Sequence, residues 1–141
     1  MSRVQGVMGA HSRNKGVMGA HSRNKGASAE REMAAILRAR GYLDARRGQQ
    51  FAGGGDSPDV IGIPGVHLEL KRTERFALYD AVNQARRDSE GRSMPVVAHR
   101  CNATQRKGDC RGEWLFVLGC DDFFNLLARA GYGPVTVEDL I

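Results

Sequence analysis

The stretch that most constrains the fold is residues 58–71, which reads Pro-Asp-Val-Ile-Gly-Ile-Pro-Gly-Val-His-Leu-Glu-Leu-Lys. It predicts two short strands joined at Pro64-Gly65, because apolar and β-branched residues flank a turn dipeptide. Side chains alternate between the two faces of a strand, so Glu69 and Lys71 share one face with His67. The opposite face of the second strand is then an unbroken apolar stripe of Val66, Leu68 and Leu70.

The register of this hairpin decides where Asp59 lies. A two-residue loop would place Asp59 on the apolar side, whereas a three-residue loop over residues 64–66 would pair it with Lys71. We expect the longer loop, or a bulge with the same effect, which also pairs Ile63 with His67 and Ile61 with Glu69. Two carboxylates and one ammonium group would then converge at the open end of the hairpin.

This grouping of charges suits metal-assisted hydrolysis of a phosphodiester. Mg²⁺ prefers oxygen ligands and is usually held by one or two carboxylates, with water and substrate phosphate completing the octahedron. Such a metal lowers the pKa of a bound water, and a neighbouring lysine can orient that water and offset charge on the phosphate. The alternative is a surface Glu69/Lys71 pair and an unrelated aspartate in a turn, because motifs this short often match by chance.

Residues 27–40 predict a helix, because they contain no Gly or Pro and are rich in good helix formers. Ser28 is the expected N-cap and Gly41 the expected stop. Glu30 falls on the apolar face of this helix, at i, i+3, i+4 and i+7 with Met33, Ala34 and Leu37. A carboxylate that faces inward needs a cation or hydrogen bonds. The alternative is an ordinary first-turn acid at the edge of the core, and Glu32 and Arg38 are expected to be solvated.

Residues 76–88 predict a second helix after the hairpin. Its apolar stripe consists of Leu78, Ala81, Val82 and Ala85. Gln84 borders this stripe in a polar row with Asp80 and Asp88, where an amide could orient water or contact a phosphate. An ordinary surface glutamine is an equally good interpretation of Gln84.

The order of these motifs resembles the PD-(D/E)xK nuclease superfamily: a helix with Glu, a strand with Pro-Asp, a strand with Glu-x-Lys and a helix with Gln. Residues 26–32, Gly-Ala-Ser-Ala-Glu-Arg-Glu, resemble the opening of archaeal-type Holliday junction resolvases. Several other runs are similar to phage-encoded endonucleases of the same group: residues 46–51, 53–60, 67–72 and 95–100. The resemblance covers residues 26–128, although the resolvase pattern lacks a loop like the one at residues 100–111.

The resemblance implies a restriction-endonuclease-like α/β sandwich around a central mixed sheet, in the order α-β-β-β-α-β-β-α. It implies a Mg²⁺-dependent DNA endonuclease, with Mn²⁺ as a substitute, that acts as a homodimer on branched DNA. Glu30, Asp59 and Glu69 would hold the metal, Lys71 would assist the water and Gln84 would support the site. The alternatives are a nuclease of the same fold that acts on ordinary duplexes or DNA ends, and a DNA-binding module that does not cut.

The net charge of +5 is confined to the N-terminal residues 1–26, which contain five basic residues and no acid. Residues 27–141 contain 16 basic and 16 acidic side chains. The segment 6–15 is repeated identically at 16–25, so we predict a flexible basic tail at 1–26 and a nuclease domain at 27–141. No run is long and apolar enough for a membrane span or a signal peptide, so we expect a cytoplasmic protein, in the host cytoplasm if phage-encoded.

Within the nuclease domain, positive charge is clustered around the expected site. The predicted DNA-binding residues are Arg46, Arg47, Arg72, Arg75, Arg86 and Arg87. His67 could approach the metal, but an exposed strand histidine is the favoured interpretation. A partial zinc site of His99, Cys101 and Cys110 is disfavoured, because the spacing is loose and no Cys-x-x-Cys is present.

The rest of the chain is expected to be scaffold. Residues 95–99 and 114–118 predict buried strands, and a weak first strand is expected around residues 43–47. Asp121 is the expected cap of a last helix over residues 122–130, with a core-facing set of Phe123, Leu126 and Leu127.

Overall fold

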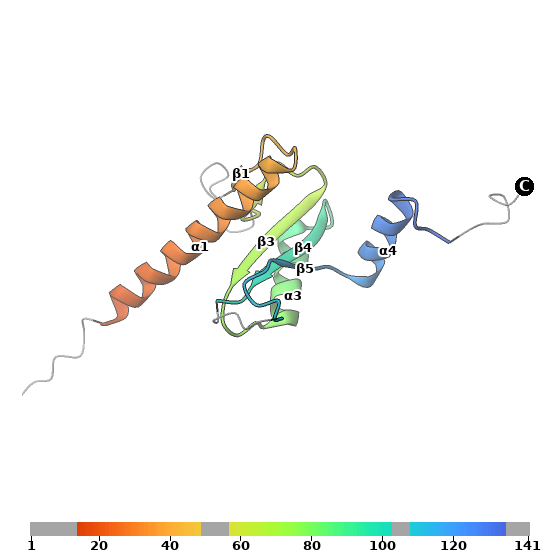
Figure 1. The fold of residues 1–141 in the computed structure, drawn as a ribbon. Helices are drawn as coiled ribbons and strands as arrows, with labels where there is room; N and C mark the ends of the chain where they lie inside the picture. Colours follow the sequence, from red (N-terminus) through yellow and green to blue (C-terminus); the bar gives the residue numbers. More distant parts are fainter. Residues whose placement is uncertain (1–13, 49–56, 103–107, 135–141) are drawn as a thin grey trace, which may run out of the picture.

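The computed structural model describes residues 14–48, 57–102 and 108–134, with the backbone alone described for residues 14–23. The described residues form a mixed α/β fold around a five-stranded mixed sheet, as expected for the broad fold class (Figure 1). The elements in chain order are α1 (Asn14–Ala39), β1 (Arg46–Arg47), β2 (Val60–Ile61), β3 (Val66–Arg72), α3 (Leu78–Ser89), β4 (Met94–Arg100), β5 (Leu115–Val117) and α4 (Cys120–Arg129).

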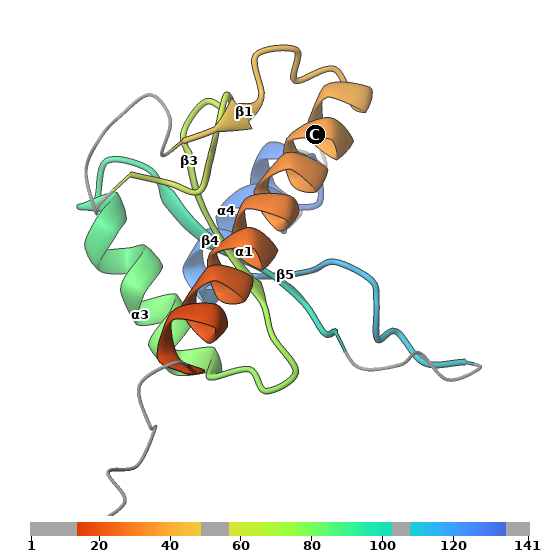
Figure 2. The same cartoon turned by 90° about the vertical axis from the view of Figure 1, so that its left-hand side faces the viewer.

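The sheet has the spatial order β1-β2-β3-β4-β5. The β3 and β4 strands are parallel and are joined by α3, whereas the other neighbouring pairs are antiparallel. Figure 2 shows β3 between α1 and α3, so the two helices cover opposite faces of the sheet. Leu68 and Leu70 pack toward α1 in the larger core cluster, and Val97 packs toward α3 in the smaller one.

Helix α1 presents the face that its periodicity predicts. Met33, Ala34 and Leu37 are buried in the larger core cluster, and Glu30 is buried beside them. The helix ends at Ala39, and Gly41 adopts a φ of +96° that an L side chain rarely takes. The backbone N–H of Gly41 donates to the Arg38 carbonyl at 3.1 Å, which satisfies one of the last carbonyls of the helix.

The predicted start of this helix was wrong. The helix begins at Asn14, so Ser28 lies within it and is not its N-cap. Residues 14–26, which we expected to belong to a flexible tail, form its N-terminal half and include the second copy of the repeat. Residues 1–13 lie outside the described residues, so the rest of the tail prediction stays a prediction.

The hairpin between β2 and β3 has a different register from the one expected. Val60 pairs with Leu68, whereas the expected three-residue loop would have paired Ile61 with Glu69 and Asp59 with Lys71. The observed register differs from the expected one by two residues. Asp59 lies directly before β2, so its position depends on its own hydrogen bonds to β3 and not on the paired strands.

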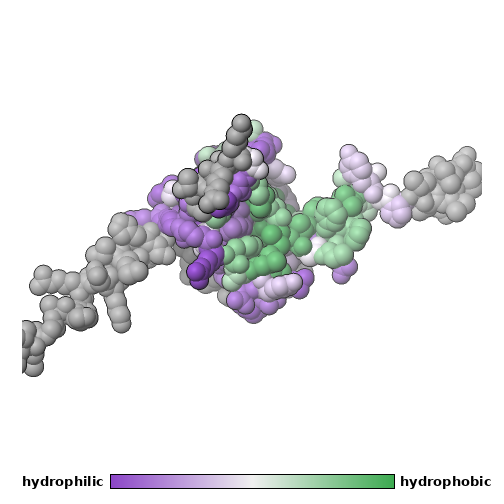
Figure 3. Space-filling view, turned by 60° about the horizontal axis from the view of Figure 1, so that its bottom comes forward, coloured by the Kyte–Doolittle hydropathy of each residue, from purple (hydrophilic) through white to green (hydrophobic). Residues whose placement is uncertain are grey.

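The C-terminal helix differs most from expectation. Helix α4 begins at Cys120 after Gly119, with no side-chain cap, so the predicted cap at Asp121 was wrong. The prediction that its apolar residues face the core was also wrong, because Phe123 and Leu126 are exposed and the helix has no buried residue. Figure 1 shows α4 set apart from the sheet, and Figure 3 shows hydrophobic surface continuing from the sheet onto this end of the molecule. In β5, Leu115 and Phe116 are likewise exposed rather than buried.

Candidate active site

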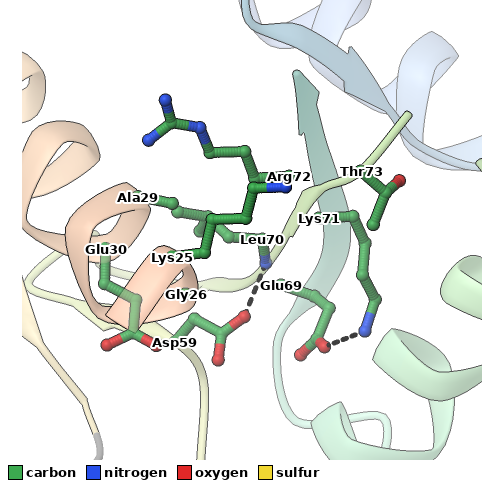
Figure 4. A pocket seen from close by; sticks show the side chains of 10 residues that line it. All are labelled: Lys25, Gly26, Ala29, Glu30, Asp59, Glu69, Leu70, Lys71, Arg72 and Thr73. Carbon is green, nitrogen blue, oxygen red and sulfur yellow. Dashed lines mark hydrogen bonds and ion pairs between the residues drawn. The ribbon is translucent and has the colours of Figure 1, made fainter. Parts of the chain in front are cut away.

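Three carboxylates from three separate parts of the chain line one hollow in the surface. Glu30 comes from α1, Asp59 directly precedes β2 and Glu69 lies in the middle of β3. Figure 4 shows the Asp59 carboxylate between those of Glu30 and Glu69, with Lys25 and Arg72 at the rim. The structure therefore brings together the three acids that the sequence pattern selected, although they lie far apart along the chain.

The position of Asp59 follows from the way in which β2 and β3 separate. The backbone N–H of Asp59, directly before β2, donates to the Leu68 carbonyl of β3 at 3.0 Å. One step further, the backbone N–H of Leu70 donates to Asp59 Oδ2 at 2.6 Å. The carboxylate thus takes the place of a strand carbonyl that β2 no longer supplies, and this bond orients it at the mouth of the split.

Lys71 is held by two acceptors on the face of β3 that α3 covers. Its ammonium Nζ donates to Glu69 Oε1 at 2.8 Å and to Gln84 Oε1 at 2.9 Å. Gln84 lies on α3 and is half-buried, so it is not the freely solvated surface glutamine of the alternative interpretation. An ammonium group has three N–H donors, and two of those of Lys71 have acceptors in the protein. The third can donate to another partner in the hollow.

The pKa of Asp59 is raised from 3.8 to about 7. Burial is the largest cause, because it disfavours the charged form, and the nearby Glu69 carboxylate raises the pKa further. The Leu70 N–H and the Lys71 ammonium lower it and only partly offset these effects. A cation bound among these acids would stabilise the charged form of Asp59, which burial and Glu69 disfavour.

Glu30 has its own cation. Arg47 Nε donates to Glu30 Oε2 at 2.5 Å, and both side chains are largely buried. Arg47, which was predicted to bind DNA, is therefore committed to an internal ion pair that satisfies the inward-facing acid. Arg72 is also engaged, because its Nε donates to Asn102 Oδ1 at 2.7 Å.

The other predicted DNA-binding arginines lie on the surface. Arg75 and Arg87 line a second hollow together with Lys71 and Gln84, so positive charge continues from the acidic hollow onto the α3 side. Arg86 is exposed on α3, and Arg46 is exposed on β1, where its Nη1 donates to the Asp44 carbonyl at 3.0 Å.

Glu32 is not the solvated residue that was expected. It accepts hydrogen bonds from the Arg100 guanidinium and from Trp114 Nε1, the latter at 3.1 Å. Arg72 Nη1 lies 3.9 Å from its carboxylate. These contacts join α1 to β3, β4 and the segment before β5, and thereby hold the helix that carries Glu30 against the sheet.

Two residues near the site were missed or misplaced by the sequence interpretation. His67 is 3% exposed, so the expectation of an exposed strand histidine was wrong. A ligand atom of His67 lies within 4.8 Å of one on Glu69 and one on Asp88. Burial lowers the pKa of His67, while the two carboxylates act in the opposite direction. Asp88 was recognised only as part of a polar row on α3, and its distance in sequence from β3 gave no signal of this contact.

The disfavoured zinc site has no support in the described part of the chain. There His99, Cys101 and Cys110 do not form a group of converging ligand atoms, and His99 instead stacks on Phe76 with ring centroids 4.1 Å apart. The Glu30, Asp59 and Glu69 ligand atoms, which are all among the described residues, do not all converge within 4.8 Å either, and Glu30 is paired with Arg47.

In comparisons with known proteins, no family model, no curated protein and no solved structure matches the chain. Among the described helices, none has both the length and the apolar character that crossing a membrane requires. The chemistry that the site can perform therefore has to follow from its own geometry and charge.

Proposed function

We propose that this chain is a Mg²⁺-dependent DNA endonuclease of the PD-(D/E)xK superfamily, with a restriction-endonuclease-like core. The observation that carries the proposal is the hollow in which Asp59 and Glu69 flank the β2–β3 split with Lys71 beside them. Two carboxylates next to an ammonium group that is held by two acceptors are suited to hold a metal and a scissile phosphate together.

The acids in the hollow fit a hard divalent cation. One oxygen of each carboxylate is held by the protein: Asp59 Oδ2 by the Leu70 N–H, Glu69 Oε1 by Lys71 and Glu30 Oε2 by Arg47. The second oxygen of Asp59 and of Glu69 would bind Mg²⁺, and Glu30 would act from the rim, directly or through water. Mn²⁺ would substitute, because it accepts the same oxygen ligands. The metal, when bound, would polarise the phosphoryl group and acidify a water.

The remaining site residues would position the reacting groups. Lys71 would donate a hydrogen bond to the attacking water or to a phosphate oxygen, and Gln84 would keep its ammonium in place. Arg75 and Arg87 would hold phosphates next to the scissile bond, because they line the hollow that continues from Lys71. Arg46 and Arg86 would contact phosphates farther away.

The resemblance to Holliday junction resolvases makes branched DNA the proposed substrate and a homodimer the proposed active form. A two-fold symmetric junction needs two sites, which an isologous dimer supplies. The exposed apolar side of α4 and β5 supports a dimer, because Phe116, Phe123 and Phe124 are each about half exposed. A module that binds DNA without cutting is disfavoured, since inward carboxylates repel phosphate and would weaken such binding.

The decisive experiment compares cleavage of a labelled synthetic four-way junction with cleavage of a matched linear duplex, in Mg²⁺ and in EDTA. We expect symmetric, Mg²⁺-dependent nicks on the junction by the wild-type protein. Asp59→Asn and Lys71→Ala are each expected to reduce cleavage by about 100-fold or more, the loss seen when one electrostatic group of an active site is removed. Asp59→Asn should keep or improve DNA binding, because it removes a negative charge.

Matched substitutions at exposed positions control for stability. Asp44→Asn and Arg92→Ala change the same kinds of charge on the surface and should cleave as the wild type does. Equal cleavage of the junction and the duplex would indicate a general endonuclease of the same fold. Binding without cleavage in any metal would indicate the non-cleaving module, and preserved cleavage by Asp59→Asn would refute the site.

A further inference from the structure

The side of β3 that faces α3 carries a second cluster of metal-binding groups, of which the proposed cleavage reaction uses only Glu69. His67 and Glu69 are adjacent on this face of β3, and Asp88 lies in the last turn of α3. One ligand atom from each of the three residues lies within 4.8 Å of those from the other two. Among the described residues, no other group of three or more His, Cys, Asp and Glu side chains brings its ligand atoms this close together.

His67 supplies an independent indication that something is to be bound here. Its side chain is almost completely buried, and its Nε2 atom has no hydrogen-bond partner in the described part of the chain. A buried polar atom without a partner costs about 1–3 kcal/mol, so such atoms are rare unless a water, an ion or a ligand completes them. The two neighbouring carboxylates make a cation the fitting occupant.

We propose that His67, Glu69 and Asp88 form a second cation site, selective for a first-row transition dication such as Mn²⁺ or Zn²⁺ over Mg²⁺. An imidazole nitrogen with two carboxylate oxygens is a donor set for these ions, whereas Mg²⁺ prefers oxygen alone. Ligands about 2.1 Å from one ion lie roughly 3 to 4 Å apart, so small side-chain movements would close the cluster around it.

The two proposed sites share only Glu69. Glu69 Oε1 already accepts Lys71, so an ion at His67 would bring a further positive charge to the carboxylate that anchors the catalytic lysine. The second site lies among buried residues, with Asp88 half-buried at its outer side, and is therefore closed to a large substrate such as DNA. Its expected role is to fix β3 against α3 and to orient Glu69.

The test uses Mn²⁺ as the probe, in the presence of excess Mg²⁺ that occupies the all-oxygen site. Pulsed electron paramagnetic resonance of bound Mn²⁺ should show ¹⁴N modulation from the imidazole, which a carboxylate-only site lacks. Asp59→Asn should keep this signal, because it alters only the proposed cleavage site. Asp88→Asn should weaken Mn²⁺ binding at least about tenfold and reduce the signal.

Asp80→Asn, the same substitution on the exposed first turn of α3, is the matched control and should bind Mn²⁺ as the wild type does. His67→Gln provides a second variant should Asp88→Asn fail to fold, and it should abolish the ¹⁴N modulation. Absence of ¹⁴N modulation in the wild type, or unchanged Mn²⁺ affinity and modulation in these site variants, would overturn the second site. Neither of these results decides whether the protein cleaves DNA at the Asp59 site. The second cation site and the proposed cleavage function can therefore fail separately.

Discussion

Asp59 is under two opposing influences, because the bond from the Leu70 N–H favours its charged form while burial and Glu69 disfavour it. The balance places its pKa near 7 in the metal-free protein. A carboxyl that binds a proton at neutral pH has to release it when a cation binds in its place. Metal binding at this site should therefore strengthen as the pH rises.

The same pKa predicts how stability depends on pH without metal. The folded-state pKa of about 7 lies above the ordinary value of 3.8, so the folded protein binds the extra proton between these values. The free energy of unfolding therefore contains a stabilising contribution below about pH 4 that is lost as the pH rises to 7, at about 1.4 kcal/mol for each pH unit between the two pKa values. Asp59→Asn should remove this decline in stability when EDTA keeps the protein free of metal. Between pH 5 and 7, a range that lies between the two pKa values, the melting temperature of the variant should therefore fall less than that of the wild type.

Thermal unfolding at a series of pH values provides the measurement, and Asp44→Asn is the control that should keep the wild-type slope. Addition of Mg²⁺ should restore wild-type stability at neutral pH, because a ligand that binds only the folded state stabilises it. Parallel pH profiles for the wild type and Asp59→Asn in EDTA would show that Asp59 does not titrate as described.

At the scale of elements, the site depends on how closely β1 passes the segment that precedes β2. The Gly48 N–H donates to the Asp59 carbonyl at 3.0 Å, directly after β1. A Cβ added at Gly48 would overlap the carbonyl oxygen of Pro58. Position 48 thus requires glycine, because the backbone at Gly48 passes very close to the backbone at Pro58. This close contact sets the position of the next residue, Asp59.

Gly48→Ala should therefore destabilise the protein and impair the site. We expect a loss of about 1–3 kcal/mol in the free energy of unfolding, typical of an overpacked position. Cleavage should fall by about tenfold or more, because a shift of the order of 1 Å in a catalytic group can cost this much. Chemical denaturation and initial rates of junction cleavage measure the two effects.

Gly26→Ala is the control for the effect on stability alone, because Gly26 also lines the acidic hollow. Gly26 lies within α1 and has no atom within 4 Å of an added Cβ, so alanine should stabilise the helix by up to about 1 kcal/mol. Wild-type stability and activity in Gly48→Ala would show that the backbone can relax away from Pro58 without moving Asp59.

At the scale of the whole molecule, the exposed apolar surface near the C-terminus is the feature that the rest of the fold leaves unexplained. Tyr42, Phe116 and Leu126 line a shallow apolar groove beside the sheet, and Phe124 is 59% exposed on α4. An amphipathic helix beside an apolar groove is the kind of surface that two copies of one chain can cover reciprocally.

Phe124→Asp should dissociate the proposed dimer. Sedimentation velocity should show a dimer for the wild type and a monomer for the variant, because a charge in an apolar interface is left without a partner. Junction cleavage should lose its paired nicks while single nicks persist. Tyr79→Asp, at another exposed aromatic residue, should remain dimeric. A monomeric wild type would exclude this surface as a self-association site under those conditions.

Local periodicity alone determined which residues share a face. The alternation in residues 66–71 separates the apolar stripe from Glu69 and Lys71, and the spacing in α1 places Glu30 beside Met33 in the core. These relations depend only on the repeat of a strand or a helix, so they could be predicted without knowledge of the fold. The predicted register of the hairpin, by contrast, was wrong by two residues.

Tertiary structure decided everything that depends on contacts between distant segments. The ion pair of Glu30 with Arg47, the approach of Asp88 to His67 and the exposure of α4 have no signature in local sequence. The physical reason is that such contacts depend on how strands end, how closely backbones pass and which surfaces are already covered. A period of two or 3.6 residues carries no information about these long-range choices.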